Sequence, residues 1–332
     1  MNFYDLTLTD LENYFISQGQ NKAKAQILYK SIYRNNIPLE NITELSEKTK
    51  AQITRDLLFP LPKIIALNED KETVKALLGF SDGSKTETVL MRHQYGSGLC
   101  VSTQVGCAMG CAFCQSGRLK KRRSLTAGEM VSQIITMSNT APVAHISVMG
   151  IGEPLDNFDN VKSFLEIISS PYGLAYGERH ITLSTCGIVP MINRLPEINA
   201  GFNLAVSLHA PNNELRSRLM PVNKRWGLDA LLGAIKTYSA ENGKRIAFEY
   251  ILIDGMNDST EQAKELAELI NGINCFVNLI PYNETANSEF KRSKNADEFF
   301  DTLKKEGVNA IFRREFGSGI KAACGQLSAE YE

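Results

Sequence analysis

The stretch Cys107-Ala-Met-Gly-Cys111-Ala-Phe-Cys114 gathers three cysteines within eight residues of a 332-residue chain. It follows an apolar run, Leu99–Val105, that predicts a buried strand. The three thiols should therefore lie on a loop at the C-terminal end of that strand, where α/β proteins place their active sites. Three thiolates can hold three corners of a cubane iron–sulfur cluster, whereas a closed cluster needs four ligands. The triplet predicts a cluster with one iron left open to a further ligand.

A structural zinc site is the alternative interpretation of these thiols. Such a site needs four ligands, commonly arranged as two cysteine pairs. Cys100, seven residues before the triplet, could supply a fourth sulfur, but no second pair follows later in the sequence. The spacing favours the iron–sulfur cluster and leaves zinc open.

Apolar runs alternate with amphipathic helical patterns on the C-terminal side of the triplet. Two capping boxes, Thr126-Ala-Gly-Glu129 and Ser259-Thr-Glu-Gln262, mark the starts of predicted helices. Repeated strand–helix units predict an α/β fold with a parallel sheet and right-handed crossovers, either open or curled toward a barrel. The further predicted strands are His145–Gly150, His180–Thr185, Asn203–His209, Ile246–Ile253 and Phe276–Ile280.

The N-terminal part of the chain has a different character. Residues 1–62 show helical spacing of apolar residues until Pro60 and Pro62 end it. Two short strands, Thr73–Phe80 and Thr86–Arg92, should follow, joined by a turn with hairpin chemistry. We therefore expect a helical domain over 1–62, a β-hairpin connector over 63–97 and a core over 98–327.

Composition excludes several classes of protein. Hydrophobic residues make up 43% and charged residues 22%, which excludes disorder, collagen and coiled coil. No run reaches the roughly 18 apolar residues of a membrane helix, and the start is acidic where a signal peptide would be basic. We expect a cytoplasmic protein with no membrane partner.

Charge gives only a local signal for nucleic acid. The formal net charge is −1, so binding would require basic residues focused on one face. Five cations, Arg118 and the run Lys120–Arg123, follow the cysteine loop and are suited to phosphate contacts. A solvated loop is the alternative.

With Phe113 just before its last cysteine, the triplet resembles the radical S-adenosylmethionine (radical SAM) enzymes. The resemblance implies a partial (β/α)6 barrel and one 4Fe–4S cluster held by Cys107, Cys111 and Cys114. It also implies that the open iron chelates S-adenosylmethionine, and that an external donor supplies the electron that cleaves the sulfonium to a 5′-deoxyadenosyl radical. It does not indicate the substrate.

Seven further segments narrow the resemblance to the RlmN/Cfr group of RNA adenine methyltransferases, between about Glu87 and Leu327. They are Val101-Ser-Thr-Gln-Val-Gly-Cys107, Met149-Gly-Ile-Gly-Glu-Pro154, Leu183-Ser-Thr-Cys-Gly187, Ser207-Leu-His-Ala-Pro211, Leu219-Met-Pro221, Asn278-Leu-Ile-Pro-Tyr-Asn283 and Ala322-Ala-Cys-Gly-Gln-Leu327. The group implies radical SAM methylation of adenosine C2 in 23S ribosomal RNA, with transfer RNA as a second candidate substrate. Residues 1–62 would then help to grip RNA.

Two alternatives to this function stay open. One is C8 methylation of the same kind of adenosine, which would confer antibiotic resistance. Pro154 after Glu153 favours C2, because the C8 enzymes tend to have Ala at that place. The other is a zinc-stabilised RNA-binding protein without enzymatic activity.

The resemblance assigns a set of strand-end residues to S-adenosylmethionine. Taken alone, Glu153 would be typical of a tight turn with a solvated acid, and the others of core polar groups or turn residues. Their expected positions at strand ends agree with the assignment. The set is Gly152, Glu153, Ser184, Ser207, Leu208, His209 and Asn283.

Three catalytic roles also come from the resemblance. Cys324 becomes methylated and carries the methyl group to RNA, Cys100 forms a transient disulfide with it that an external reductant reopens, and Glu87 accepts a proton. Taken alone, Cys324 would be a small buried hydrophobe and Glu87 an acid on the exposed face of a hairpin strand. Cys186 and Cys275 are expected to be core residues.

Two departures from the group's pattern bear on the site. Gly319 stands where an Asp usually precedes the Ala-Ala-Cys segment, and Gln115-Ser116 stand where Ala-Thr often follows the last cluster cysteine. They put substrate positioning in doubt more than the radical step.

Overall fold

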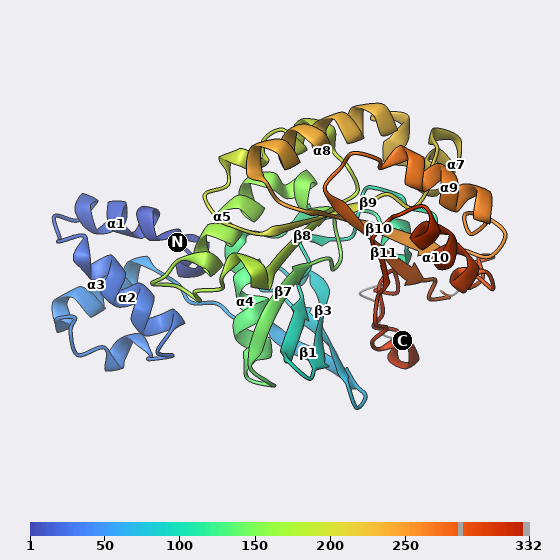
Figure 1. The fold of residues 1–332 in the computed structure, drawn as a ribbon. Coiled ribbons are helices and arrows are strands. Elements are labelled where there is room, and N and C mark those ends of the chain that lie inside the picture. Colours follow the sequence, from blue (N-terminus) through green and yellow to red (C-terminus); the bar gives the residue numbers. More distant parts are fainter. Residues whose placement is uncertain (285–287, 328–332) are drawn as a thin grey trace.

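The computed structural model describes residues 1–284 and 288–327 (Figure 1). Within them, one sheet of ten strands organises the molecule. In sheet order the strands are β1 (Lys63–Glu69), β2 (Thr73–Gly79), β3 (Lys85–His93), β4 (Gly96–Cys100), β7 (Val143–Val148), β8 (Ile181–Thr185), β9 (Asn203–Ser207), β10 (Ile246–Leu252), β11 (Cys275–Pro281) and β12 (Ala310–Phe312).

Strand pairing in the sheet changes from antiparallel to parallel at β4. From β1 to β4 each neighbouring pair is antiparallel, and from β4 to β12 each neighbouring pair is parallel. β9 and β10 are mostly buried, as their continuous apolar runs predict, whereas buried and partly exposed residues alternate in β8 and most of β7 is partly exposed. The predicted α/β fold with a parallel sheet is confirmed.

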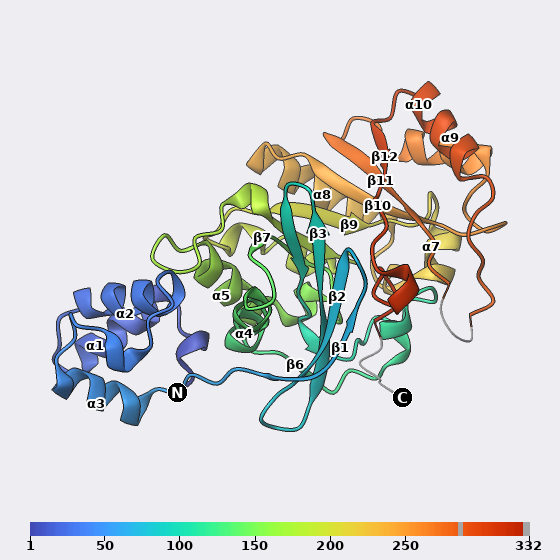
Figure 2. The same cartoon turned by 90° about the horizontal axis from the view of Figure 1, so that it is seen from below.

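Helices follow the parallel strands and lie on the outside of the curved sheet (Figures 1 and 2). Both predicted capping boxes form, at Thr126 and at Ser259. The helices are α1 (Leu8–Ser17), α2 (Ala23–Tyr33), α3 (Glu47–Asp56), α4 (Ala127–Ser138), α5 (Phe158–Ser169), α6 (Val189–Ile192), α7 (Asn213–Leu219), α8 (Leu228–Asn242), α9 (Thr260–Leu269) and α10 (Ala296–Lys305). No helix in the described part of the chain has the length and apolar character to span a bilayer.

The first predicted strand, Leu99–Val105, is wrong at its C-terminal end. β4 ends at Cys100, and Gln104–Val105 (β5) pair instead with Arg123–Ser124 (β6) in a separate small sheet. Between them the Ser102 N–H donates to the Gln133 side chain, 3.0 Å away, so the apolar run continues after the ladder stops. The other five predicted strands agree with the structure within two residues at each end.

The predicted hairpin is present as β2 and β3, but it belongs to a larger unit. β1 pairs with β2, and β3 pairs with β4, so the segment 63–97 extends the main sheet. We did not predict β1, whose residues are mostly exposed and whose pairing contains a bulge, or the three-residue β12. The edge formed by β1 to β3 positions Glu87 beside the core.

Helices α1–α3 form a lobe at one end of the molecule (Figures 1 and 2). The expected boundary at residues 62 and 63 falls between α3 and β1. The lobe contacts the core through a 3-10 helix, Phe3–Asp5, because the Gly128 N–H at the start of α4 donates to the Asp5 carboxylate, 2.6 Å away. A Cβ on Gly128 would lie 2.8 Å from the Asp5 nitrogen, so this approach requires glycine.

Candidate active site

Two adjoining cavities lie at the C-terminal ends of the parallel strands. The first is lined by most of the predicted residues, and the second adds Cys100 and Asn283. Cys114, Arg313 and Cys324 line both. The predicted residues that line the first cavity are Cys107, Cys111, Cys114, Gly152, Glu153, Ser184, Ser207, His209 and Cys324.

The loop with the three cluster cysteines is held by backbone contacts. The Ala112 N–H donates to the Leu219 carbonyl after α7, 2.9 Å away, and the Cys114 N–H donates to the Cys111 carbonyl, 3.2 Å away. Gly106 opens the loop with a φ of 76°, and a Cβ there would lie 2.3 Å from the Lys120 carbonyl oxygen. Only glycine allows this entry to the loop.

The chemistry of the three thiols fits an iron–sulfur cluster. Burial raises the pKa of Cys107 to about 11, and burial and the neighbouring thiolates raise the pKa of Cys111 well above its usual value. Three half-buried thiols whose ionisation is opposed by their surroundings and by one another require a strong local cation to become ligands. Among the described residues no group of three His, Cys, Asp or Glu side chains is arranged around a single ion, whereas a cubane spreads its ligands over several irons.

Glu153 is buried rather than solvated, so its interpretation as an exposed turn acid is wrong. Its carboxylate accepts hydrogen bonds from the Thr185 hydroxyl at 2.7 Å and from the Cys186 N–H at 2.8 Å. Burial raises its pKa. Gly152 precedes it with a φ of 110°, and a Cβ there would lie 2.7 Å from Thr103 Oγ1. The backbone can therefore approach closely while the carboxylate faces the cavity.

His209 connects the strand ends to the cluster loop. The Ile251 N–H donates to His209 Nδ1 at 3.0 Å, so the proton of the neutral ring lies on Nε2. Burial and the Arg216 guanidinium lower the His209 pKa to about 3, which keeps the ring neutral. Its ring packs edge-on against Phe113, with centroids 4.8 Å apart. The aromatic residue of the cysteine motif thus orients a cavity residue.

Leu208 lies between two cavity residues but its side chain does not reach either cavity. It is fully buried in the core, and its N–H donates to the Glu249 carbonyl at 3.0 Å. Any contact of Leu208 with the cofactor would therefore have to be made by its backbone.

Cys100 and Cys324 meet in the second cavity, as their predicted partnership requires. Burial and the nearby Cys324 thiolate raise the Cys100 pKa to about 12. Such a thiol is a weak nucleophile until its surroundings change. The Cys100 thiol is therefore kept protonated at neutral pH.

The cluster loop holds the segment that carries Cys324. The Gln115 N–H donates to the Gly325 carbonyl at 2.7 Å, and the Ser116 hydroxyl donates to the Leu327 carbonyl at 2.6 Å. Gln115 and Ser116 therefore make both hydrogen bonds although they differ from the usual Ala-Thr. The first uses a backbone N–H, and the second uses a hydroxyl that serine and threonine share. A Cβ on Gly319 would meet nothing within 4 Å, so that departure changes no packing in the site.

Glu87 is not an acid on an exposed hairpin face, and that interpretation is wrong. Its side chain is 0% exposed and forms an ion pair with Lys75 of β2, 3.0 Å away. Lys75 Nζ also donates to the Lys321 carbonyl at 3.2 Å, in the segment that carries Cys324. Glu87 lines neither cavity, but Val89, on the same face of β3, lines the second. The Cα atoms of Glu87 and Val89 are about 7 Å apart in such a strand, so Glu87 is next to the cavity wall on that face.

Lys75→Met should lower the free energy of unfolding by about 3–5 kcal/mol, because it removes one partner of a buried ion pair. Urea unfolding under anaerobic conditions measures the change. Lys85→Met, at the exposed start of β3, is the matched control and should stay within about 0.5 kcal/mol of the parent. The double variant Lys75→Met/Glu87→Gln should recover most of the loss. An equal loss in the single and double variants would show that the ion pair is not the cause.

Two charged residues that the sequence did not indicate also line the cavities: Glu249 lines the first, and Arg313 lines both. Glu249 of β10 accepts from Asn278 Nδ2 at 3.0 Å and pairs with Arg313 Nη1 at 3.5 Å. The nearby Cys324 thiolate and Glu249 raise the pKa of Arg313. Glu249 could have been predicted as a site residue because it is a charged residue inside the apolar run 246–253. No sequence feature marks Arg313, because the strand before it has only three residues.

The two remaining cysteines differ from each other. Cys186 is buried, as expected, but it also lines the first cavity. Cys275 is only partly buried, at the N-terminal end of β11 and away from both cavities. The prediction of a core residue is therefore incomplete for Cys186 and too strong for Cys275.

The model of the radical SAM superfamily matches residues 101–270. A probable dual-specificity RNA methyltransferase RlmN of Spiroplasma citri is 45% identical, over 97% of this chain and 96% of its own length. A protein of the same name from Acholeplasma laidlawii is 44% identical over 99% of both chains. The chain belongs to the RlmN family of radical SAM methyltransferases.

A solved structure supports the same placement. The radical SAM methyltransferase from Sphaerobacter thermophilus is 39% identical, with a TM-score of 0.93 over 99% of this chain and all of that one. The radical SAM barrel and the RlmN resemblance are confirmed, and the likeness also includes α1–α3, beyond the segment that holds the motifs. Membership in an enzyme family sets aside the interpretation as a zinc-stabilised binding protein.

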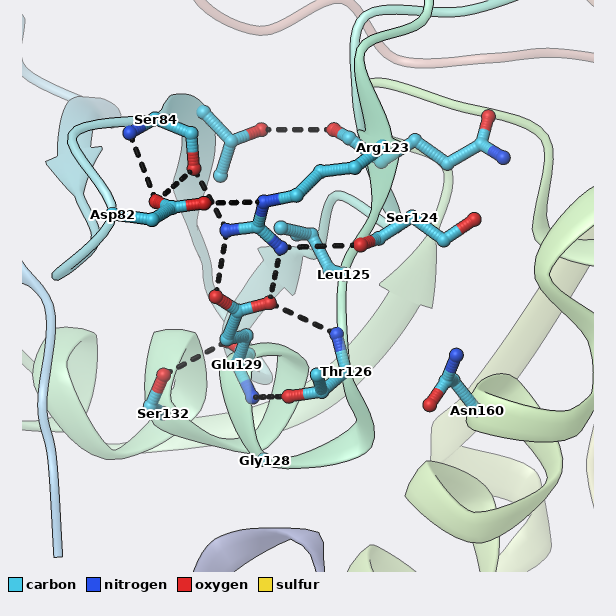
Figure 3. Close-up of polar contacts among 12 residues, drawn as sticks. Asp82, Ser84, Arg123, Ser124, Leu125, Thr126, Gly128, Glu129, Ser132 and Asn160 are labelled. Carbon is cyan, nitrogen blue, oxygen red and sulfur yellow. Dashed lines mark hydrogen bonds and ion pairs between the residues drawn. The ribbon is translucent and has the colours of Figure 1, made fainter. Parts of the chain in front are cut away.

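The basic run of this RlmN-family chain is partly occupied by internal ion pairs. Arg123 joins the β2–β3 turn to the start of α4, with Asp82 at 2.6 Å and Glu129 at 2.7 Å (Figure 3). Lys121 pairs with Asp156 at 2.8 Å. Lys120 and Arg122 are exposed. Within the run Lys120–Arg123, these two side chains are the exposed ones, so they are the most accessible to a phosphate.

Proposed function

We propose that this enzyme methylates C2 of an adenosine in 23S ribosomal RNA, with transfer RNA as a second substrate. The names of its relatives, probable dual-specificity RNA methyltransferases, support RNA as the substrate class. One observation carries the mechanism. Cys324 lines the cavity of the three cluster cysteines and also the cavity that contains Cys100. A methyl carrier needs access to both a methyl source and a resolving thiol.

The 4Fe–4S cluster would be held by Cys107, Cys111 and Cys114. S-adenosylmethionine would be surrounded by Gly152, Glu153, Ser184, Ser207, the Leu208 backbone, His209 and Asn283. When both are bound, S-adenosylmethionine would supply a methyl group, and together with the cluster it would supply a hydrogen-abstracting radical once an external donor has provided an electron. The Glu153 carboxylate suits an ammonium group, since a buried carboxylate is stabilised by a cation. The apolar walls exclude water from the cavity.

Cys324 accepts the methyl group at sulfur by displacement. Once hydrogen has been removed from that methyl group, its carbon adds to the electron-poor ring carbon and links the protein to RNA. The unpaired electron of this adduct then has to pass to a one-electron acceptor, for which the oxidised cluster would serve. Glu87 accepts the ring proton. Because Glu87 lies beside the cavity wall, the segment held by Lys75 at Lys321 must shift for the carboxylate to reach the base.

Cys100 resolves the link. The Cys100 thiol loses its proton and its sulfur attacks the sulfur of Cys324, so an S–S bond forms while the bond between Cys324 sulfur and the transferred carbon breaks. The carbon keeps the electron pair of that bond, takes up a proton and leaves as the methyl group of the base. An external reductant then supplies two electrons and two protons to restore both thiols. A buried site also requires the target adenosine to be unstacked. Lys120, Arg122 and the α1–α3 lobe would hold the flanking RNA, in the cytoplasm where such RNA is found.

The methylated position is the direct test of this function. RNA from cells that lack the methyltransferase is incubated with the reconstituted enzyme, digested, and its nucleosides are separated by mass spectrometry. We expect 2-methyladenosine, since Pro154 follows Glu153. A product that co-elutes with 8-methyladenosine would show that the enzyme methylates C8 instead of C2. If no methylated adenosine forms, both proposed activities are rejected.

A further inference from the structure

Arg216 of α7 is a fully buried cation surrounded by neutral acceptors. It has the largest side chain among the fully buried residues, at 0% exposed. Its Nη2 donates to the carbonyls of Cys186 at 2.7 Å and Ser207 at 3.0 Å. Its Nε donates to the Leu208 carbonyl at 3.2 Å, and its Nη1 donates to Asn223 Oδ1 at 2.9 Å. These four hydrogen bonds use four of the five N–H donors of the guanidinium, and because the acceptors are neutral they do not neutralise its charge.

Arg216 takes part in none of the ion pairs found within residues 1–284 and 288–327. Burial lowers its pKa to about 10, and the groups that oppose this effect are the thiolates of Cys186 and Cys111. The side chain is therefore still charged at neutral pH. A buried charge normally has a partner of opposite sign, because leaving water is otherwise very costly. The anion that Arg216 faces has to come from a bound group.

The position of Arg216 indicates which anion this is. Cys186 and Ser207, whose carbonyls it bonds, follow β8 and end β9, and both line the first cavity. Cys111, a predicted cluster ligand, is within its electrostatic reach. A 4Fe–4S cluster held by three thiolates carries a net negative charge when oxidised and a further one when reduced.

We propose that Arg216 is a permanent countercharge for the cluster, which favours the more negative, reduced state and so raises the reduction potential. The proposal rests on the cluster ligands assigned above. Arg216 does not touch reacting atoms in this role and acts through the cluster alone. An external donor then needs a less extreme potential to start each reaction.

The test is an anaerobic redox titration of the reconstituted enzyme without S-adenosylmethionine, followed by electron paramagnetic resonance. Arg216→Met should lower the ratio of reduced to oxidised cluster at least tenfold at a fixed potential near the midpoint, which corresponds to a fall of about 59 mV for one electron. Arg216→Lys keeps the charge and should stay close to the parent. Arg123→Met is the matched control, since Asp82 and Glu129 already neutralise Arg123, and its potential should not change.

Asn223→Asp provides a second variant if Arg216→Met does not fold. It places a carboxylate where Asn223 Oδ1 already accepts from Arg216, so it neutralises the guanidinium and should lower the potential in the same direction. Unchanged potentials in Arg216→Met and Asn223→Asp, with full iron content, would overturn the proposal. So would an equal fall in Arg216→Met and Arg216→Lys, which would assign the effect to the hydrogen bonds.

One outcome separates this proposal from the proposed function. Weaker binding of S-adenosylmethionine with an unchanged potential would make Arg216 a partner of the cofactor's carboxylate and would overturn the countercharge. Failure of the parent enzyme itself to assemble a cluster would contradict the ligand assignment on which both proposals rest.

Discussion

Cys100→Ala is expected to convert the enzyme into a covalent trap for its RNA. Cys324 still lies beside the three cluster cysteines in this variant, so it can be methylated, activated and added to the base. Without the Cys100 sulfur in the second cavity, the link between Cys324 and the base has no resolving thiol. Free methylated RNA should fall below about one turnover, and a protein–RNA species should remain after denaturation in a gel with labelled RNA.

Two further variants control this experiment. Cys100→Ser should behave like Cys100→Ala, because a hydroxyl is a far weaker nucleophile toward sulfur. Cys100→Ala/Cys324→Ala should give no adduct, since the carrier is missing, while the cluster remains. Multiple turnover by Cys100→Ala would show that another thiol resolves the link, and Cys186, which lines the first cavity, would be the first to replace next.

Cys107→Ala, Cys111→Ala and Cys114→Ala should each lose the cluster and all reductive cleavage of S-adenosylmethionine. Each removes one of only three proposed protein ligands, so no substitute sulfur holds that corner. Iron and sulfide analysis with visible absorption, made anaerobically after reconstitution, measures the loss, and chromatography follows 5′-deoxyadenosine.

Cys275→Ala is the matched control for the cluster variants. It also removes one thiol, but from the far end of β11, and should keep the parent's iron content. Full iron in any of the three cluster variants would mean that the ligand set is wrongly chosen. Loss of iron in Cys275→Ala as well would indicate general instability instead.

Local patterns predicted the parallel strands and the cysteine loop, because burial on both faces produces continuous apolar runs and ligand spacing is a property of one short segment. The same reasoning misplaced the end of β4. Apolar character continues past Cys100 for packing reasons, while the Ser102 N–H already bonds to the Gln133 side chain. Hydrophobicity alone does not show where a hydrogen-bond ladder stops.

The errors at Glu87 and Glu153 have a different physical origin. Both are buried by segments distant in the sequence: Glu87 by Lys75 and the Lys321 segment, and Glu153 by the end of β8. Alternation in a hairpin or a turn composition describes only the immediate neighbours. Arg216 and Arg313 escaped notice for the same reason, since their partners come from several strands.

The anchoring of Gly325 and Leu327 to Gln115 and Ser116 imposes an order on biosynthesis. A nascent chain exposes every proposed cluster ligand long before Cys324 leaves the ribosome. A cluster inserted at that stage would have no carrier thiol beside it and no segment covering the second cavity. A cluster on the loop of residues 107–114 would therefore gain its proposed carrier thiol only after the segment of Gly325 and Leu327 has docked on Gln115 and Ser116.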